Sequence, residues 1–144
     1  MQIIRKPESS KEWEDYYHLR WEILRAPLNL DKGSEKDDLE DSATHRAVFD
    51  NEKIVGIGRL HFIDKNKAQI RYMAILEDYR GKGLGRMIVE EFAQISEQNK
   101  IFKIILYARE SVIEFYKKLD FEIIKKAHRL ENIQHFSMER KNNY

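Results

Sequence analysis

The sequence predicts an α/β fold on the border of the α+β class, with a mixed, mostly antiparallel central sheet and helices on both faces. Three observations support this prediction. A helical pattern opens the chain, alternating strand patterns follow it, and a later strand–helix–strand order predicts one parallel, right-handed crossover. The length of 144 residues suits one domain, and a hydrophobic fraction of 42% is sufficient for one core. We therefore expect residues 1–144 to form a single domain.

The first predicted element is a helix that begins after Ser9, because Ser9 and Glu12 have the spacing of a capping box. Apolar and aromatic residues then recur at helical spacing from Trp13 to Leu24. Pro27 limits this helix, since proline cannot donate the hydrogen bond that a helix interior requires.

A polar region, residues 28–44, follows the first helix, and one short helix is expected inside it. Six acidic residues lie between Asp31 and Asp41, among them Asp37 and Asp38. This acidic segment is either a solvated loop or a surface that attracts a cationic amine.

From residue 45 the pattern changes to the two-residue period of strands. The first three strands are predicted at residues 45–49, 54–62 and 68–76, with turns between them. In the third of these we expect Ala68, Ile70, Tyr72 and Ala74 to lie on one face. Residues 104–108 are nearly all apolar, as expected for a buried parallel strand. Two final segments, 122–126 and 134–141, are expected to pair as an antiparallel edge.

Two further helices are predicted from apolar residues at helical spacing. The first follows residue 83 and the second follows the buried strand. Their apolar positions are Leu84, Ile88, Phe92 and Ile95 in the first, and Val112, Phe115, Tyr116 and Leu119 in the second.

Composition excludes several classes of protein and site. Lys and Arg total 26 against 25 Asp and Glu, so the net charge of +1 argues against binding nucleic acid through a basic face. The absence of cysteine excludes disulfides, thiolate zinc sites and cysteine nucleophiles. Apolar runs such as residues 104–108 are too short to span a bilayer, and the first residues lack the apolar core of a secretory signal. We expect a cytoplasmic protein that binds neither nucleic acid nor membrane and holds no metal.

Three of the six glycines, Gly81, Gly83 and Gly85, lie within five positions between a predicted strand and a predicted helix. Glycines there allow consecutive backbone N–H groups to point inward, and the helix start adds free N–H groups and a positive dipole end. The flanking basic residues are Arg80, Lys82 and Arg86. Such a loop is suited to binding a phosphate or pyrophosphate.

Four interpretations of this loop compete. A Walker A loop requires Ser or Thr after Gly-Lys, whereas Gly83 follows Lys82. A dinucleotide fingerprint requires one more residue before the last glycine. The third is the pattern Arg80-x-x-Gly83-x-Gly85 after an extended strand. The fourth is a turn that only joins strand to helix, but such a turn requires neither three glycines nor the flanking basic residues.

The third pattern resembles the signature with which the GCN5-related N-acetyltransferase (GNAT) superfamily binds the pyrophosphate of acetyl-CoA. Residues 72–75 are similar to the superfamily strand that runs beside the pantetheine arm, and residues 108–121 to its next strand end and helix. Residues 132–138 are similar to the Gly-Ile-Pro-His-x-x-Met ending of a subgroup of small, single-domain bacterial members. The resemblance is good over residues 68–126, whereas the first 45 residues match only in element order.

Three residues depart from the superfamily pattern. Asp120 stands where glycine is usual after the second helix, and aspartate tolerates a left-handed φ there. Arg109 stands where many members have asparagine, so a side-chain contact to the cofactor at that position is in doubt. Gln69 lies where histone-modifying members place a glutamate general base, which this chain therefore lacks.

The resemblance implies the acyl-CoA N-acyltransferase fold, one N-acetyltransferase domain over residues 1–144, and direct transfer from acetyl-CoA to a primary amine in a ternary complex. It implies that Tyr116 protonates the departing thiolate, and that a backbone N–H near Met73 to Ile75 stabilises the oxyanion. The cofactor-binding residues that it implies are Met73, Ala74, Ile75, Arg80, Gly81, Lys82, Gly83, Leu84, Gly85 and Arg86.

Several points stay open. The general base is unassigned, with His135, His45 and His61 as candidates. The acceptor is a small-molecule or peptide amine of unknown identity, and a homodimer is compatible with the resemblance. The transferred acyl chain could also differ from acetyl, and the depth of the pocket near Met73 and Phe115 decides which chain fits. The alternative function is a non-catalytic acyl-CoA-binding regulator that acts through a partner protein.

Overall fold

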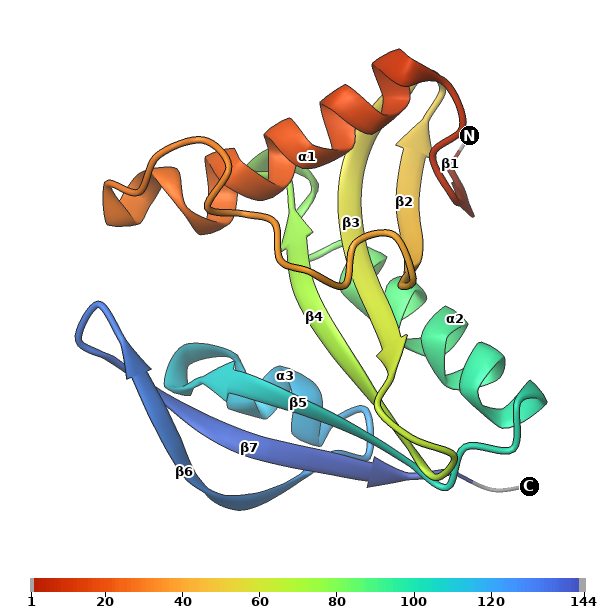
Figure 1. Ribbon diagram of the computed structural model, residues 1–144, viewed down its shortest axis with the longest axis vertical. Helices are drawn as coiled ribbons and strands as arrows, with labels where there is room; N and C mark the ends of the chain where they lie inside the picture. The colour runs from red at the N-terminus through yellow and green to blue at the C-terminus, as the bar shows by residue number, and fades with distance from the viewer. Residues whose placement is uncertain (1, 143–144) are drawn as a thin grey trace.

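A computed structural model describes residues 2–142 and contains one seven-stranded sheet in the order β1-β2-β3-β4-β5-β7-β6 (Figure 1). The β4–β5 pair is parallel and the other five neighbouring pairs are antiparallel. The strands are β1 (Gln2–Arg5), β2 (Thr44–Asp50), β3 (Lys53–Phe62), β4 (Lys67–Ile75), β5 (Lys103–Arg109), β6 (Glu122–Leu130) and β7 (Ile133–Lys141). The predicted mixed, mostly antiparallel sheet with one parallel crossover is therefore confirmed.

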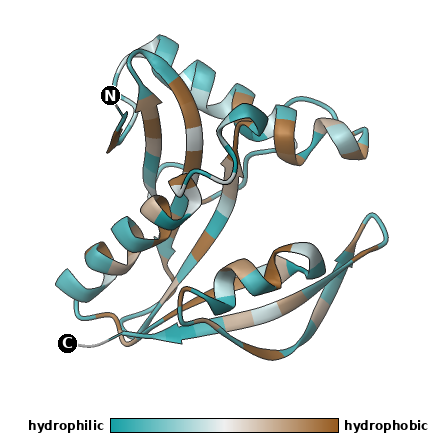
Figure 2. Cartoon of the chain, turned by 180° about the vertical axis from the view of Figure 1, so that it is seen from behind, coloured by the Kyte–Doolittle hydropathy of each residue, from teal (hydrophilic) through white to brown (hydrophobic). Residues whose placement is uncertain are grey.

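Helices cover both faces of the sheet, as predicted. α1 lies on one face, and the view from behind shows α2 and α3 in front of the other face (Figures 1 and 2). The α-helices are α1 (Ser10–Leu24), α2 (Leu84–Gln98) and α3 (Ile113–Lys117); the 3₁₀ helices are η1 (Ala26–Leu28), η2 (Glu77–Tyr79) and η3 (Glu110–Val112). Within residues 2–142, no helix is both long and apolar enough to cross a membrane.

The two faces carry two separate hydrophobic clusters, because alternate strand residues point to opposite sides. On β2, Val48 belongs to the cluster beneath α2 and α3, whereas Ala47 and Phe49 belong to the cluster beneath α1. The apolar faces of α1 and α2 thus cover opposite sides of the same strands. The predicted capping box of α1 is confirmed, since Ser9 Oγ accepts from the N–H of Glu12 at 3.1 Å.

A bulge in β4 overturns one prediction. Tyr72 has a φ of +59°, and the register with β3 shifts between Ile57 and Arg59. As a result Ala68 and Ile70 pack beneath α2, whereas Ala74 packs beneath α1. The expectation that Ala68, Ile70, Tyr72 and Ala74 share one face is therefore wrong, because the extra residue of the bulge reverses the alternation of the strand.

The parallel pair β4–β5 is short. It joins residues 67–69 of β4 to residues 103–105 of β5, and beyond these residues the two strands diverge (Figure 1). The second half of β4 is bonded to β3 on one side and, among residues 2–142, has no strand partner on the other. Its backbone groups on that side are available to a ligand that lies between the strands.

Two segments differ from the sequence-based expectation. Strand β1 was not predicted and pairs with the edge of β2, Gln2 opposite Asp50 and Arg5 opposite Ala47. The short helix expected within residues 28–44 is absent: η1 ends at Leu28, and turns follow it up to residue 43.

Candidate active site

A cleft of about 1000 Å³ lies where β4 and β5 separate. Its walls are formed by β4, β5, the glycine loop, α3, the end of α1 with η1, and the tip of the β6–β7 hairpin. The predicted residues that line this cleft are Met73, Ala74, Ile75, Arg80, Gly81, Gly83, Leu84, Gly85 and Tyr116. The other two predicted residues, Lys82 and Arg86, are exposed beside it and are not part of its lining.

The glycine loop has the backbone conformation that its sequence predicts. Gly81 and Gly83 have φ values of +75° and +84°, and an added Cβ would meet no atom within 4 Å at either position. Glycine is therefore required by backbone conformation and not by crowding. Gly83 is the N-cap of α2 without a side-chain cap, and the N–H of Met87 is the one that returns to Gly83 O, at 3.0 Å. The N–H groups that precede it have no intrahelical acceptor, and a helix start of this kind can bind an anion.

Contacts on both sides hold this loop in place. Arg80 Nε donates to Ile75 O at 3.0 Å, which fixes the loop to the end of β4. The Tyr79 hydroxyl donates to Asp50 Oδ2 at 2.6 Å. Gly85 lies so close to Phe115 that an added Cβ would be 2.9 Å from the ring Cζ. The loop is thus packed between β4 and α3 at one end of the cleft.

Tyr116 is buried on α3 and lines the cleft. Its ring packs edge-on against Phe115 and Phe121, with centroid distances of 4.9 and 5.7 Å. No hydrogen-bond partner of its hydroxyl lies within residues 2–142. Burial raises the pKa of Tyr116, and the nearby Arg109 lowers it to a smaller extent. The phenol is therefore protonated at neutral pH and remains a proton donor.

Of the three candidate histidines, His135 lies at the cleft. Its Nδ1 is 3.0 Å from Ile133 O, and since a carbonyl can only accept, Nδ1 carries a proton; in a neutral imidazole the lone pair is then on Nε2. His128 stacks on His135 with ring centroids 4.8 Å apart, and Tyr107 packs edge-on against His128. Burial is the main cause that lowers the pKa of His128, and the neighbouring His135 and Arg71 lower it further.

Sequence analysis did not find His128, because it lies beyond the segment 122–126 that was predicted as a strand. Neither His45 nor His61 lines the cleft. His45 is buried beneath α1, between the Tyr16 hydroxyl at 2.8 Å and Glu40 O at 2.7 Å. His61 is half-buried, with Nδ1 at 3.5 Å from Arg59 Nη2.

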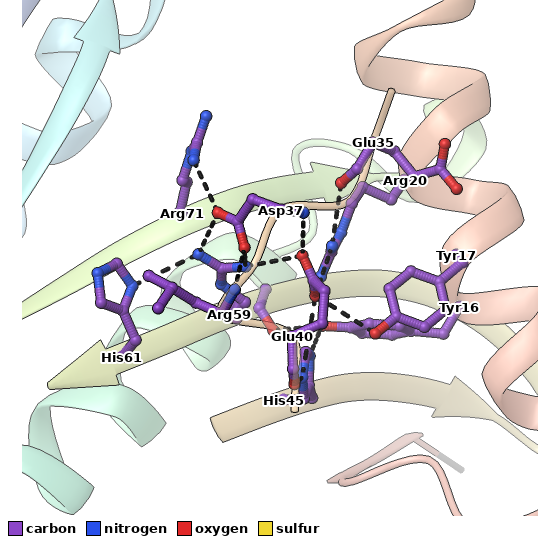
Figure 3. Close-up of polar contacts among 12 residues, drawn as sticks. Tyr16, Tyr17, Arg20, Glu35, Asp37, Glu40, His45, Arg59, His61 and Arg71 are labelled. Carbon is purple, nitrogen blue, oxygen red and sulfur yellow. Dashed lines mark hydrogen bonds and ion pairs between the residues drawn. The ribbon is translucent and has the colours of Figure 1, made fainter. Parts of the chain in front are cut away.

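The acidic segment is divided, which corrects both expectations in part: Asp31, Asp38 and Asp41 are exposed, whereas other carboxylates of the segment are bound to arginines. Asp37 binds Arg59 through both oxygens, at 2.6 and 2.9 Å, and Arg71 at 3.0 Å (Figure 3). Glu40 binds Arg20 at 2.9 Å and Arg59 at 2.8 Å. Arg20 and Arg59 are fully buried, so these carboxylates are held by the protein as counterions.

The buried titratable groups predict that stability falls in two stages as the pH is lowered. Burial lowers the pKa of His45, so the unfolded chain binds a proton below about pH 6.5 that the folded chain does not bind. The hydrogen bond from Arg59 lowers the pKa of Asp37, so further stability is lost below about pH 4.

Urea unfolding at pH 8, 5.5 and 4 measures both stages. His45→Gln should reduce the first stage, whereas the exposed control His18→Gln should not; a flat profile from pH 8 to 5.5 would contradict this.

Comparisons with known proteins agree with this geometry. The model of the Acetyltransferase (GNAT) family matches residues 11–121. Over 137 residues the chain is 27% identical to the uncharacterized N-acetyltransferase YjcF of Bacillus subtilis (strain 168), covering 94% of this chain and 96% of that protein. An acyl-CoA N-acyltransferase from Pseudomonas aeruginosa superimposes with a TM-score of 0.82 at 19% identity, over 97% of this chain and 98% of that one. An aminoglycoside 6'-N-acetyltransferase complexed with coenzyme A gives 0.82 at 13% identity, over 96% of both chains.

Proposed function

Because the chain belongs to the Acetyltransferase (GNAT) family and is an acyl-CoA-dependent N-acetyltransferase, we propose that it transfers acetyl from acetyl-CoA directly to a primary amine in a ternary complex. Its fold is the acyl-CoA N-acyltransferase fold. We further propose that residues 1–144 act as one such domain. Direct attack is favoured over a covalent acyl-enzyme because the sequence contains no cysteine nucleophile.

The observation that carries this proposal is the glycine loop at the uncapped start of α2. Gly81 and Gly83 give the backbone a left-handed turn without Cβ atoms, so successive N–H groups can converge on a diphosphate. Lys82 and Arg86 are exposed beside the loop and supply positive charge for the phosphate oxygens. Acetyl-CoA would supply the acetyl thioester, with its diphosphate against this loop.

The free edge of β4 is suited to the pantetheine arm. Residues 70–75 have no strand partner on the cleft side, so their backbone groups can pair with the amides of an extended ligand. Met73, Ala74 and Ile75 lie directly after the bulge at Tyr72. We assign to this segment the backbone N–H that would stabilise negative charge on the thioester oxygen.

Two side chains are assigned to proton transfer. Tyr116 is the acid, because its hydroxyl is protonated and has no partner among the described residues, and it would donate to the departing thiolate. His135 is assigned as the base, because it lines the cleft and its Nδ1–H is bound to Ile133 O, so that Nε2 of the neutral imidazole can accept a proton from the amine directly or through water.

The test of the cofactor site is binding of acetyl-CoA measured by calorimetry. Gly83→Ala is expected to weaken binding about tenfold, because a Cβ at a φ of +84° costs about 1–2 kcal/mol and displaces the N–H groups of the loop. Gly33→Ala is the matched control: Gly33 also has a positive φ, +105°, with open space around it, but lies outside the cleft. It should bind acetyl-CoA like the unaltered protein.

Two outcomes would contradict parts of the proposal. If the unaltered protein binds neither CoA nor acetyl-CoA, the glycine loop is only a turn between strand and helix. If acetyl-CoA binds tightly but a broad panel of amines gives no release of CoA thiol, the transfer is contradicted and the regulatory alternative is favoured.

A further inference from the structure

Among the described residues, the cleft lining contains four arginines and no carboxylate. The basic residues in this lining are Arg25, Arg71, Arg80, Arg109, His128 and His135. Arg80 belongs to the glycine loop and Arg109 to the strand end beside Tyr116, so both lie at the end that we assign to CoA. Arg25 and Arg71 lie toward α1 and the bulge of β4, where the acceptor would enter, and neither has a role in the functions assigned above.

Arg25 carries a charge that no carboxylate neutralises. It is the C-cap residue of α1, and its guanidinium donates to two backbone carbonyls, Leu24 O at 3.0 Å and Ser34 O at 3.3 Å. Among residues 2–142, no carboxylate oxygen lies within salt-bridge distance of it. These neutral acceptors hold the side chain in position at the cleft without cancelling its charge, and an anion would therefore be attracted to it.

Arg71 is only partly compensated. Its single carboxylate contact is Asp37 Oδ2 at 3.0 Å, and the same oxygen accepts from Arg59 Nη2 at 2.9 Å (Figure 3). The connected cluster contains three guanidinium groups, Arg20, Arg59 and Arg71, against two carboxylates, Asp37 and Glu40. The two buried arginines occupy most of the carboxylate oxygens, so the excess positive charge remains on Arg71, whose side chain is 45% exposed.

Both arginines lie beside the ring of Tyr72, as do the buried Arg20 and Arg59. The guanidinium carbons of Arg71 and Arg25 lie 4.6 and 5.6 Å from its centroid. The bulge produces this arrangement, because it places the side chains of two consecutive residues, Arg71 and Tyr72, toward the α1 side of the sheet. Four guanidinium groups surround this ring, and of these only Arg25 and Arg71 line the cleft. Guanidinium groups suit a planar carboxylate, because they can donate two parallel hydrogen bonds to it.

We propose that Arg25 and Arg71 bind a carboxylate of the acceptor, and that the acceptor is therefore a free amino acid. This inference rests on the proposed function and names its substrate class. Polycationic amines are disfavoured, because the cleft offers them no carboxylate and repels them with two arginines. The carboxylate would also orient the amine, since a bidentate contact fixes one end of a short molecule within the cleft.

The experiment compares matched acceptors with acetyl-CoA as the donor. Glycine, leucine, phenylalanine and glutamate are each assayed beside their α-carboxamides and decarboxylated amines, with release of CoA thiol as the signal. The carboxamide amine loses its proton more readily, so a preference for the free acid must come from the protein. For at least one amino acid we expect kcat/KM to be about tenfold or more higher than for its carboxamide.

Variants of the two arginines test whether these side chains cause the preference for the free acid. Arg71→Gln and Arg25→Gln should each reduce the ratio of kcat/KM between acid and carboxamide about tenfold, mainly through KM for the acid. Lys11→Gln, which removes one positive charge on an exposed side chain near the start of α1, should retain the ratio. Acetyl-CoA affinity of the two arginine variants should stay within about twofold, because their site belongs to the acceptor.

The outcomes separate this inference from the proposed function. Equal or better use of carboxamides or decarboxylated amines overturns the inference and leaves acetyl transfer intact. A large loss of acetyl-CoA affinity in Arg71→Gln also overturns it, since the arginines would then serve the phosphates of CoA. If no acceptor turns over, N-acetylated amino acids and their carboxamides are titrated into CoA-saturated protein, and equal affinities overturn the inference. Absence of CoA binding overturns the proposed function itself.

Discussion

Replacing Arg59 by methionine is expected to lower the free energy of unfolding by about 3 kcal/mol. Arg59 is fully buried and donates to both Asp37 and Glu40, and the side chain of Glu40 is only 10% exposed. Methionine fills a similar volume but leaves these carboxylates with fewer donors in a poorly solvated site. The cost comes from the poorly solvated carboxylates, each of which is left with one guanidinium partner, Arg71 for Asp37 and Arg20 for Glu40.

Urea unfolding at pH 7 measures this effect. The control is Arg46→Met, because Arg46 pairs with Glu91 at 2.8 Å near the surface, where an ion pair contributes less than about 1 kcal/mol. The double variant Arg59→Met/Asp37→Asn should recover part of the lost stability, since it removes the charge of one of the two carboxylates that lost the Arg59 donor. A loss below about 1 kcal/mol for Arg59→Met, equal to the control, would show that the cluster is solvated like a surface pair.

Tyr116→Phe is expected to lower kcat about 100-fold, because it removes the proton donor to the departing thiolate. Phenylalanine retains the edge-on contacts with Phe115 and Phe121, so the packing of α3 should be preserved. Since burial raises the pKa of Tyr116, the phenol stays protonated well above neutral pH and should not itself cause a loss of kcat between pH 7 and 9.

The measurement is steady-state kinetics together with the dissociation constant of acetyl-CoA. That constant should stay within about twofold of the value for the unaltered protein, which separates a chemical role from a binding role. Full kcat in the phenylalanine variant, with unchanged acetyl-CoA affinity, would assign Tyr116 to packing and remove it from the mechanism.

Most regular elements could be predicted because they depend on local sequence signals. The capping box at Ser9 and Glu12 and the periodicity that follows it locate α1 without reference to the rest of the chain. The Asp120 turn has a φ of +70°, as its residue type allowed. By contrast, β1 is only four residues long, and it is a strand because the edge of β2 pairs with it.

The candidate site was predictable in part for the same reason. The glycine loop requires positive φ at Gly81 and Gly83, which is a property of the residue type and is visible in the sequence. His128 and the arginine cluster carry no such signal. A histidine or arginine alone has no local conformational signature, and its role depends on which side chains the fold brings near it.

The sequence by itself determined the order of the three α-helices and of strands β2 to β7, the one parallel crossover and the left-handed glycine loop, because periodicity, caps and glycine conformations act over a few residues. Only the tertiary structure decided which face each side chain of β4 occupies, since a single inserted residue at Tyr72 reverses the alternation that the pattern implies. It also decided that Asp37 and Glu40 are counterions of buried arginines, because pairing of charges distant in sequence depends on long-range contacts. The charge of the cleft follows from those contacts and not from the near-zero net charge of the chain.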